Sequence, residues 1–297
     1  MVNVTANKSL IGYTYLRIGG PAEWFAEPRN IHELRELISW ADEKNLSVRI
    51  IGAGSNILVA DEGVKGLVIS LKTACAAIEV NGTNIITGSA VMLPALAKKA
   101  ASSGLSGAEF CIGIPGTVGG ALQSNSGTTV NSDMSTIVEQ ITVLKNGELR
   151  NYDHNDIIWG YRETSLKRSG NIVIEASFNL VNKSSDVINS DMRALLASRK
   201  ATQPTAEPNA GSIFKNPEGD YAGRLIEAAG CKKLGTKNAS VNQLHANFIT
   251  HNGNASSDEI VYLITEIQQK VRASFGIELT PEIEWWGPEV QPRCFNN

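Results

Sequence analysis

Apolar residues recur at intervals of three or four along several stretches of the chain, which is typical of amphipathic helices. The clearest stretches are residues 31–46 and 93–103, and Gly104 is expected to end the second. A third helix is expected to run toward Arg199 after a polar interruption near residues 183–190.

The last expected helix carries the most complete set of signals. Ser256 and Glu259 have the spacing of a capping box, in which each side chain accepts a hydrogen bond from the other residue's backbone. Gly276 marks the expected end of this helix. The apolar residues between these signals share one face: Ile260, Leu263, Ile264, Ile267 and Val271.

Shorter apolar runs predict strands. Residues 66–90 alternate around Asn81-Gly82, a pair typical of a hairpin turn. Residues 277–285 also alternate, and a full strand is expected there. The other strand-like runs are 48–51, 57–59, 137–144 and 171–180. Helices and strands that mix without regular βαβ repetition indicate the α+β fold class.

Composition narrows the possible partners. The formal net charge is -3, so the chain has no basic field that could attract nucleic acid or an anionic membrane. It starts without a signal-peptide pattern and contains no apolar run long enough to cross a bilayer, so a cytoplasmic protein is expected. The scattered cysteines and histidines predict free thiols and no bound metal.

Gly52-Ala53-Gly54-Ser55-Asn56 is the first of two glycine-rich turns. It leads into a strand-like run and lacks the third glycine of a Rossmann motif, so a Rossmann fold is disfavoured. Consecutive backbone N–H groups in such a turn can bind an anion, with Ser55 and Asn56 as further donors. A plain tight turn is the alternative.

Ile114-Pro115-Gly116-Thr117-Val118-Gly119-Gly120 is the second glycine-rich turn. Its missing Cβ atoms would let a flat or charged ligand lie against the backbone, although a loop packed on its own core could have the same composition. Together, the two turns point to one large cofactor that contains a diphosphate.

A third polar segment, residues 209–217, contains Ser212 followed by Lys215 and Asn216. The lysine and the asparagine can donate to an anion. A hydrolase triad is unsupported, because the segment has no histidine and the chain has no GxSxG turn. An ordinary surface serine is the alternative.

Seven short motifs in order along essentially the whole chain closely resemble the UDP-N-acetylenolpyruvoylglucosamine reductase (MurB) family. They are Arg17–Ala22, Gly52–Asn56, Gly113–Gly120, Tyr161-Arg162, Gly211–Pro217, His245–Phe248 and Pro281-Glu282. The resemblance implies a two-subdomain FAD-binding fold, similar to that of vanillyl-alcohol oxidase (PCMH-like), and a C-terminal α+β substrate-binding domain. The expected domains are residues 1–72, 73–183 and 184–297.

The resemblance also implies a reaction. NADPH reduces FAD and leaves, and the enolpyruvyl ether of UDP-N-acetylglucosamine takes its place. Flavin N5 then gives a hydride to the terminal carbon of the double bond, and the carbon that bears the carboxylate is protonated. The product is UDP-N-acetylmuramate, a peptidoglycan precursor. FAD would be bound by Gly52–Asn56, Ile114–Gly120, Asn125-Ser126-Gly127 and Arg162.

Three residues match the family's catalytic positions: Arg162, the proton donor Ser212, and Glu282. The arginine would stabilise the doubly anionic carboxylate that hydride addition leaves. Glu282 could hydrogen-bond the enolic oxygen if burial keeps it protonated. Lys215 and Asn216 are expected to bind the substrate. From the residues alone, Glu282 could belong to a solvated acidic edge and Arg162 to a surface ion pair.

The chain departs from the family pattern at three places. Thr164 and Asn242 stand where serine is usual, and Glu284 lies in a region where arginine is common. One alternative is another FAD oxidoreductase of this fold that acts on a different alcohol or enol ether. The other is a flavin-binding protein without catalysis. A monomer that binds a nucleotide sugar is expected.

Overall fold

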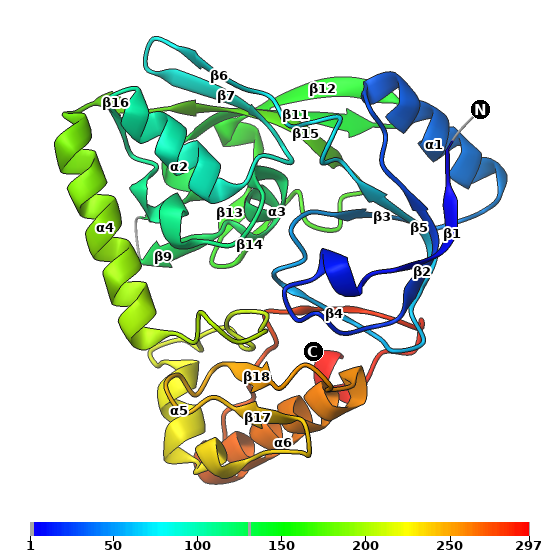
Figure 1. The fold of residues 1–297 in the computed structure, drawn as a ribbon, viewed down its shortest axis with the longest axis vertical. Coiled ribbons are helices and arrows are strands. Elements are labelled where there is room, and N and C mark those ends of the chain that lie inside the picture. The colour runs from blue at the N-terminus through cyan, green and yellow to red at the C-terminus, as the bar shows by residue number, and fades with distance from the viewer. Residues whose placement is uncertain (1–2, 130–131, 297) are drawn as a thin grey trace. The chain divides into compact units, whose positions relative to one another are not determined.

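The computed structural model describes residues 3–129 and 132–296, which form two compact units (Figure 1). Unit 1 comprises Met1–Val4, Ala26–Ala53 and Val68–Arg199, and unit 2 comprises Thr5–Phe25, Gly54–Leu67 and Lys200–Asn297. Helices and strands mix in both, which confirms the α+β class. The division into three consecutive domains stays a prediction.

Unit 1 is built on an antiparallel five-stranded sheet with the order β12-β11-β15-β7-β6. The hairpin expected at Asn81-Gly82 is confirmed, because Asn81 pairs with Asn84 and Gly82 has a φ of 61°. The strands are β6 (Ile78–Asn81), β7 (Asn84–Gly88), β11 (Val138–Lys145), β12 (Glu148–Asp153) and β15 (Ile172–Asn179).

Helices α2 and α3 lie against one face of this sheet (Figure 1), and Leu96, Leu122 and Phe178 belong to the core that they share with it. The helices expected near residues 31–46 and before Gly104 are confirmed, as is the one that runs past Arg199. The α-helices described in this part of the chain are α1 (Ile31–Glu43), α2 (Leu93–Ser102), α3 (Val118–Ser124) and α4 (Ser185–Thr202).

Unit 2 has its core along α6 (Ser257–Phe275), whose expected apolar face is at most 1% exposed from Ile260 to Val271. The Ser256–Glu259 capping box is confirmed, and Gly276 ends the helix with a φ of 69°. The other elements of this unit include α5 (Ala222–Ala228), β4 (Ile57–Val59), β17 (Ala239–Val241), β18 (Ile249–His251) and β19 (Glu284–Trp286).

The full strand expected over residues 277–285 is wrong. Only β19 forms, and it pairs in parallel with β4. Proline has no N–H to give to a strand ladder, and at Pro281 the chain makes only an isolated bridge with Phe214. Leu279 and Ile283 are nevertheless buried, so the apolar face of the expected strand is retained.

A further sheet has the order β1-β2-β5-β3, and the unit boundary falls within β5. Its strands are β1 (Thr5–Ser9), β2 (Pro21–Ala26), β3 (Val48–Ile51) and β5 (Val64–Ser70). The short strands are β8 (Leu105–Ser106), β9 (Gly127–Thr129), β10 (Ser132–Asp133), β13 (Trp159–Gly160), β14 (Glu163–Thr164) and β16 (Val181–Asn182). In the described part of the chain, no helix has the length and apolar character needed to span a membrane.

Candidate active site

The turn Gly52–Asn56 has the geometry of an anion-binding turn. Gly54 has a φ of 64°, and a Cβ there would lie 2.1 Å from the Tyr13 carbonyl oxygen, so only glycine fits. Among the described residues, none accepts a hydrogen bond from the N–H groups of Ala53, Gly54 or Ser55. Three successive donors are therefore left for a ligand, which suits a phosphate.

The two glycine-rich turns touch each other within unit 1. A Cβ on Gly52 would lie 2.5 Å from Thr117 Oγ1. Thr117 is the N-cap of α3, and its hydroxyl accepts a 3.4 Å hydrogen bond from Gly120 N–H. Glycine at position 52 therefore makes room for the helix cap.

Most backbone donors of the second turn are used inside the protein. Val118 N–H donates to the Val91 carbonyl oxygen at 2.8 Å, and Gly119 N–H donates to the Ser89 carbonyl oxygen at 2.8 Å. Gly116 N–H donates to Ile114. These three N–H groups are therefore not available to a cofactor. The turn would instead contact a cofactor through the flat faces of its peptide groups.

Arg162 lies in the tight turn that joins β13 and β14 and has a left-handed φ of 57°. Both strands of this hairpin are tied to α3. Asn125, at the end of α3, donates from Nδ2 to the Gly160 oxygen at 3.1 Å, and Thr164 Oγ1 donates to the Leu122 oxygen at 3.1 Å. The threonine at position 164 thus keeps the hydroxyl of the usual serine. Arg162 is half-buried, and the hairpin that carries it is held to α3 by these hydrogen bonds.

The segments of Ser212 and Glu282 run side by side within unit 2. Glu282 N–H donates to the Ile213 oxygen at 2.7 Å, and Lys215 N–H donates to the Thr280 oxygen at 2.9 Å. Both Ser212 and Glu282 are half-buried. The structure therefore brings these two predicted residues onto adjacent segments, whereas Arg162 belongs to unit 1.

Several predicted binding side chains also have structural partners. Asn216 Oδ1 accepts a 3.0 Å hydrogen bond from Ala222 N–H at the start of α5. Ser126 Oγ lies 2.8 Å from Ser124 Oγ, and a Cβ on Gly127 would lie 2.4 Å from the Ser132 oxygen. Contacts of these residues with a ligand stay predictions.

One residue that sequence reasoning missed is Asn247. It is 3% exposed and hydrogen-bonds the segment that follows Ser212. The available signal was a polar residue between Ala246 and Phe248 in an apolar run, inside a motif that served only to recognise the family.

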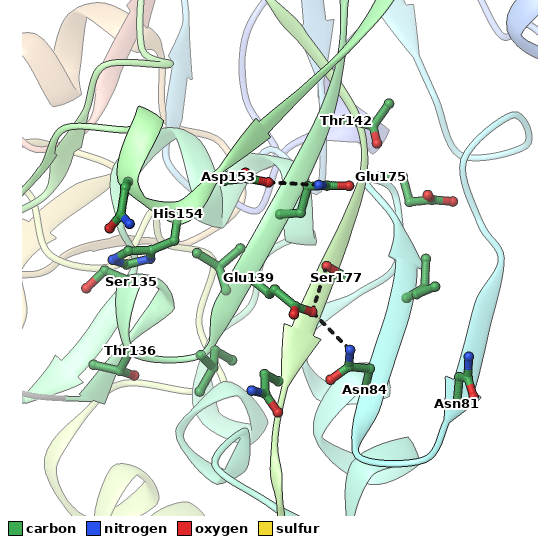
Figure 2. Close-up of a pocket in the computed structure, with 16 residues that line it drawn as sticks. Asn81, Asn84, Ser135, Thr136, Glu139, Thr142, Asp153, His154, Glu175 and Ser177 are labelled. Carbon is green, nitrogen blue, oxygen red and sulfur yellow. Dashed lines mark hydrogen bonds between the residues drawn. The ribbon is translucent and has the colours of Figure 1, made fainter.

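A polar hollow of about 910 Å³ lies on the sheet face of unit 1, but it contains none of the predicted site residues (Figure 2). Glu139 is among its lining residues and accepts hydrogen bonds from Asn84 and Ser177. No lysine or arginine is among its lining residues, all of which are described. It therefore lacks a cation for a diphosphate or a carboxylate.

Known proteins resemble this chain along most of its length. A family model of the FAD binding domain matches residues 22–152, and one of the UDP-N-acetylenolpyruvoylglucosamine reductase C-terminal domain matches residues 203–286. UDP-N-acetylenolpyruvoylglucosamine reductase 2 of Symbiobacterium thermophilum is 42% identical, with 93% of this chain and 89% of that protein covered. The reductase of Moorella thermoacetica is 40% identical, with 96% and 94% covered. The crystal structure of UDP-N-acetylenolpyruvylglucosamine reductase (MurB) from Thermus caldophilus superposes with a TM-score of 0.82 at 32% identity, covering 96% and 99%.

Proposed function

The chain belongs to the UDP-N-acetylenolpyruvoylglucosamine reductase family, and from this we propose that it reduces the enolpyruvyl group of UDP-N-acetylglucosamine-enolpyruvate to UDP-N-acetylmuramate. FAD is the cofactor, NADPH is the reductant, and the product serves peptidoglycan synthesis. The observation that carries the proposal is the pairing of the Ser212 segment with the Glu282 segment. It supports a hydroxyl and a carboxyl group that act on one substrate.

The donors of the first glycine turn fit the diphosphate of FAD, because the N–H groups of Ala53, Gly54 and Ser55 have no acceptor among the described residues. Gly52 and Asn56 complete this turn. Residues 114–120 would line the flavin, with Asn125, Ser126 and Gly127 next to them. When bound, FAD supplies the hydride that it has received from NADPH.

Arg162 would pair with the substrate carboxylate, whose negative charge grows as the double bond is reduced. A guanidinium stays charged and can donate two parallel hydrogen bonds to a carboxylate. The tethered hairpin of Arg162 supports this role, because preorganised charge needs little rearrangement during the reaction.

Ser212 Oγ would give its proton to the carbon that bears the carboxylate, and Lys215 could help to restore that proton. Glu282, in its protonated form, would donate a hydrogen bond to the enolic oxygen. Asn216 would bind the substrate beside Lys215. We further propose that the enzyme works as a monomer in the cytoplasm.

Absorbance spectroscopy of the purified protein tests the proposal. A bound flavin should be bleached by NADPH without oxygen, and the enolpyruvyl sugar nucleotide should restore its colour. In Ser212→Ala, bleaching should keep its rate, while restoration should slow by roughly 10²–10⁴-fold, the usual contribution of a proton donor.

Protein that stays colourless after incubation with FAD would contradict the cofactor assignment. Restoration by other enol ethers alone, or bleaching by an alcohol in place of NADPH, would favour a different reaction on the same fold. A Ser212→Ala variant that restores the colour at the parent rate would remove Ser212 from the mechanism.

A further inference from the structure

The side chain of Asn247 hydrogen-bonds both the backbone N–H group and the backbone carbonyl oxygen of Phe214. Its Oδ1 accepts a 3.0 Å hydrogen bond from Phe214 N–H, and its Nδ2 donates a 2.8 Å hydrogen bond to the Phe214 oxygen. Its backbone oxygen accepts a third bond, of 2.8 Å, from Ile213 N–H. The asparagine therefore binds the two residues that directly follow Ser212.

This pairing replaces a missing strand. On one side, Ile213 and Lys215 exchange hydrogen bonds with Glu282 and Thr280. In an extended segment the backbone groups of the intervening residue point the other way. Phe214 is 1% exposed, and a buried amide without a partner is costly. The Asn247 side chain satisfies both polar groups of Phe214.

Asn247 is itself held in place by the motif around it. Its N–H donates to His245 Nδ1 at 3.3 Å, so this ring nitrogen accepts and the other carries the proton. Burial lowers the pKa of His245, which favours the neutral ring that this contact needs. Asn242 Oδ1 accepts from the N–H groups of Leu244 and His245, which closes the turn.

Ser212 lies where this support begins. Gly211, before it, has a φ of 75°, and its N–H donates a 2.9 Å hydrogen bond to Asn209 Oδ1. Ile213, after it, is 1% exposed and bonded on both sides. Ser212 therefore lies between a turn closed by Asn209 and a buried segment that Asn247 holds on its other side.

We propose that Asn247 is a positioning residue that orients Ser212 for proton donation through the backbone of Ile213 and Phe214. Asn247 does not itself touch the substrate. This inference rests on the proposed function, because it takes Ser212 as the proton donor.

The test separates the two half-reactions in Asn247→Ala, with rates expressed per bound flavin. Flavin reduction by NADPH should stay close to the parent rate. Reoxidation by the enolpyruvyl sugar nucleotide should slow by roughly tenfold or more, as expected from a misplaced proton donor. The matched control is Asn238→Ala, which removes another hydrogen-bonded amide of unit 2, the one that donates to Glu259. It should leave both rates near those of the parent.

A double-mutant cycle identifies the route of the effect. If Asn247 acts through Ser212, the combined Ser212→Ala and Asn247→Ala variant should be no slower than Ser212→Ala alone. If the two substitutions slowed reoxidation independently, so that their effects multiplied in the double variant, the inference would be overturned. An equal slowing of both half-reactions in Asn247→Ala would also overturn it. If Asn247→Ala does not fold, Asn247→Asp, which keeps the shape and the acceptor, decides by the same criteria.

The controls also separate this inference from the proposed function. A parent protein that the enolpyruvyl sugar nucleotide cannot reoxidise contradicts the function itself. A normal parent and a slow Ser212→Ala variant, combined with unaffected Asn247 variants, contradict only the positioning role.

Discussion

The side-chain amide of Asn56 donates a 3.0 Å hydrogen bond to the backbone oxygen of Glu282, 226 positions later in the chain. The Asn56 backbone oxygen in turn accepts a 2.9 Å bond from Glu284 N–H. The last residue of the first glycine turn thus fixes the backbone on both sides of Ile283. The proposed cofactor turn and the proposed catalytic carboxyl group share one rigid connection.

Asn56→Ala should therefore weaken catalysis through Glu282. Loss of one hydrogen bond of this kind costs about 1 kcal/mol, so flavin reoxidation by substrate should slow by about fivefold. Reduction by NADPH should change less. Anaerobic stopped-flow absorbance measures both rates, and Asn252→Ala, which removes an exposed amide of unit 2, serves as the control. An equal loss in both steps would contradict the link to Glu282.

Arg162 should show a conflict between stability and function. A φ of 57° costs an ordinary residue with a Cβ, such as arginine or alanine, about 1 kcal/mol relative to glycine. Arg162→Gly should therefore be more stable than Arg162→Ala by roughly this amount, while both lose most of their turnover. Thermal unfolding of the two variants checks the order. An alanine variant of equal or greater stability would show that the turn does not impose this backbone conformation.

Gly52→Ala should destabilise the protein because its Cβ would meet Thr117 Oγ1 at 2.5 Å. Overpacking of this kind typically costs about 1–3 kcal/mol. In a Thr117→Ala background the hydroxyl is gone, and the remaining Cβ would be 3.6 Å away, an ordinary contact. The glycine substitution should then cost much less. Unfolding midpoints of the four proteins measure the coupling, and simple additivity would contradict it.

Glu259 should make the stability of α6 depend on pH. Hydrogen bonds from Thr236 and Asn238 lower the pKa of its carboxyl group from 4.5 to about 2. The ionised form therefore stabilises the folded state above pH 4.5, and this contribution disappears as the pH falls toward 2.

Glu259→Gln keeps the capping-box acceptor but removes the charge, so it should lower the free energy of unfolding near neutral pH by about 0.3–1 kcal/mol, the usual contribution of a negative charge at a helix N-terminus. The difference from the parent should shrink as the solution is acidified through the range given above. Urea unfolding at a series of pH values measures it. Asp258→Asn, which removes a charge from the same helical turn, is the control. A difference that does not vary with pH would contradict the role of the charge.

Local signals predicted the local structure well. The Ser256–Glu259 capping box, the hairpin at Asn81-Gly82 and the helix end at Gly104 depend on a few neighbouring residues, and all three are confirmed. The alternation of apolar and polar residues over 277–285 wrongly predicted a full strand. Such a pattern shows which residues are buried, but it does not show whether a neighbouring strand is available for pairing. Pro281 interrupts the ladder although Leu279 and Ile283 remain buried.

The contacts that support the proposed site could not be predicted in this way. Asn247 and Phe214 are 33 positions apart, and Asn56 and Glu282 are 226 apart. No periodicity in a single sequence connects such pairs. The family resemblance supplied roles for Arg162, Ser212 and Glu282, but the side chains that hold them emerged only from the three-dimensional arrangement.

The parallel pairing of β4 with β19 has a consequence for synthesis on the ribosome. β4 ends at Val59 and its partner starts at Glu284, so roughly 220 residues are translated between the two strands. Unit 1 ends at Arg199, so all of its residues have been made before β19 is translated. At usual translation speeds of about 5–20 residues per second, β4 waits for roughly 10–45 seconds before β19 is made. During that interval the apolar strand β4 lacks its pairing partner, so it is open to binding by chaperones and to aggregation.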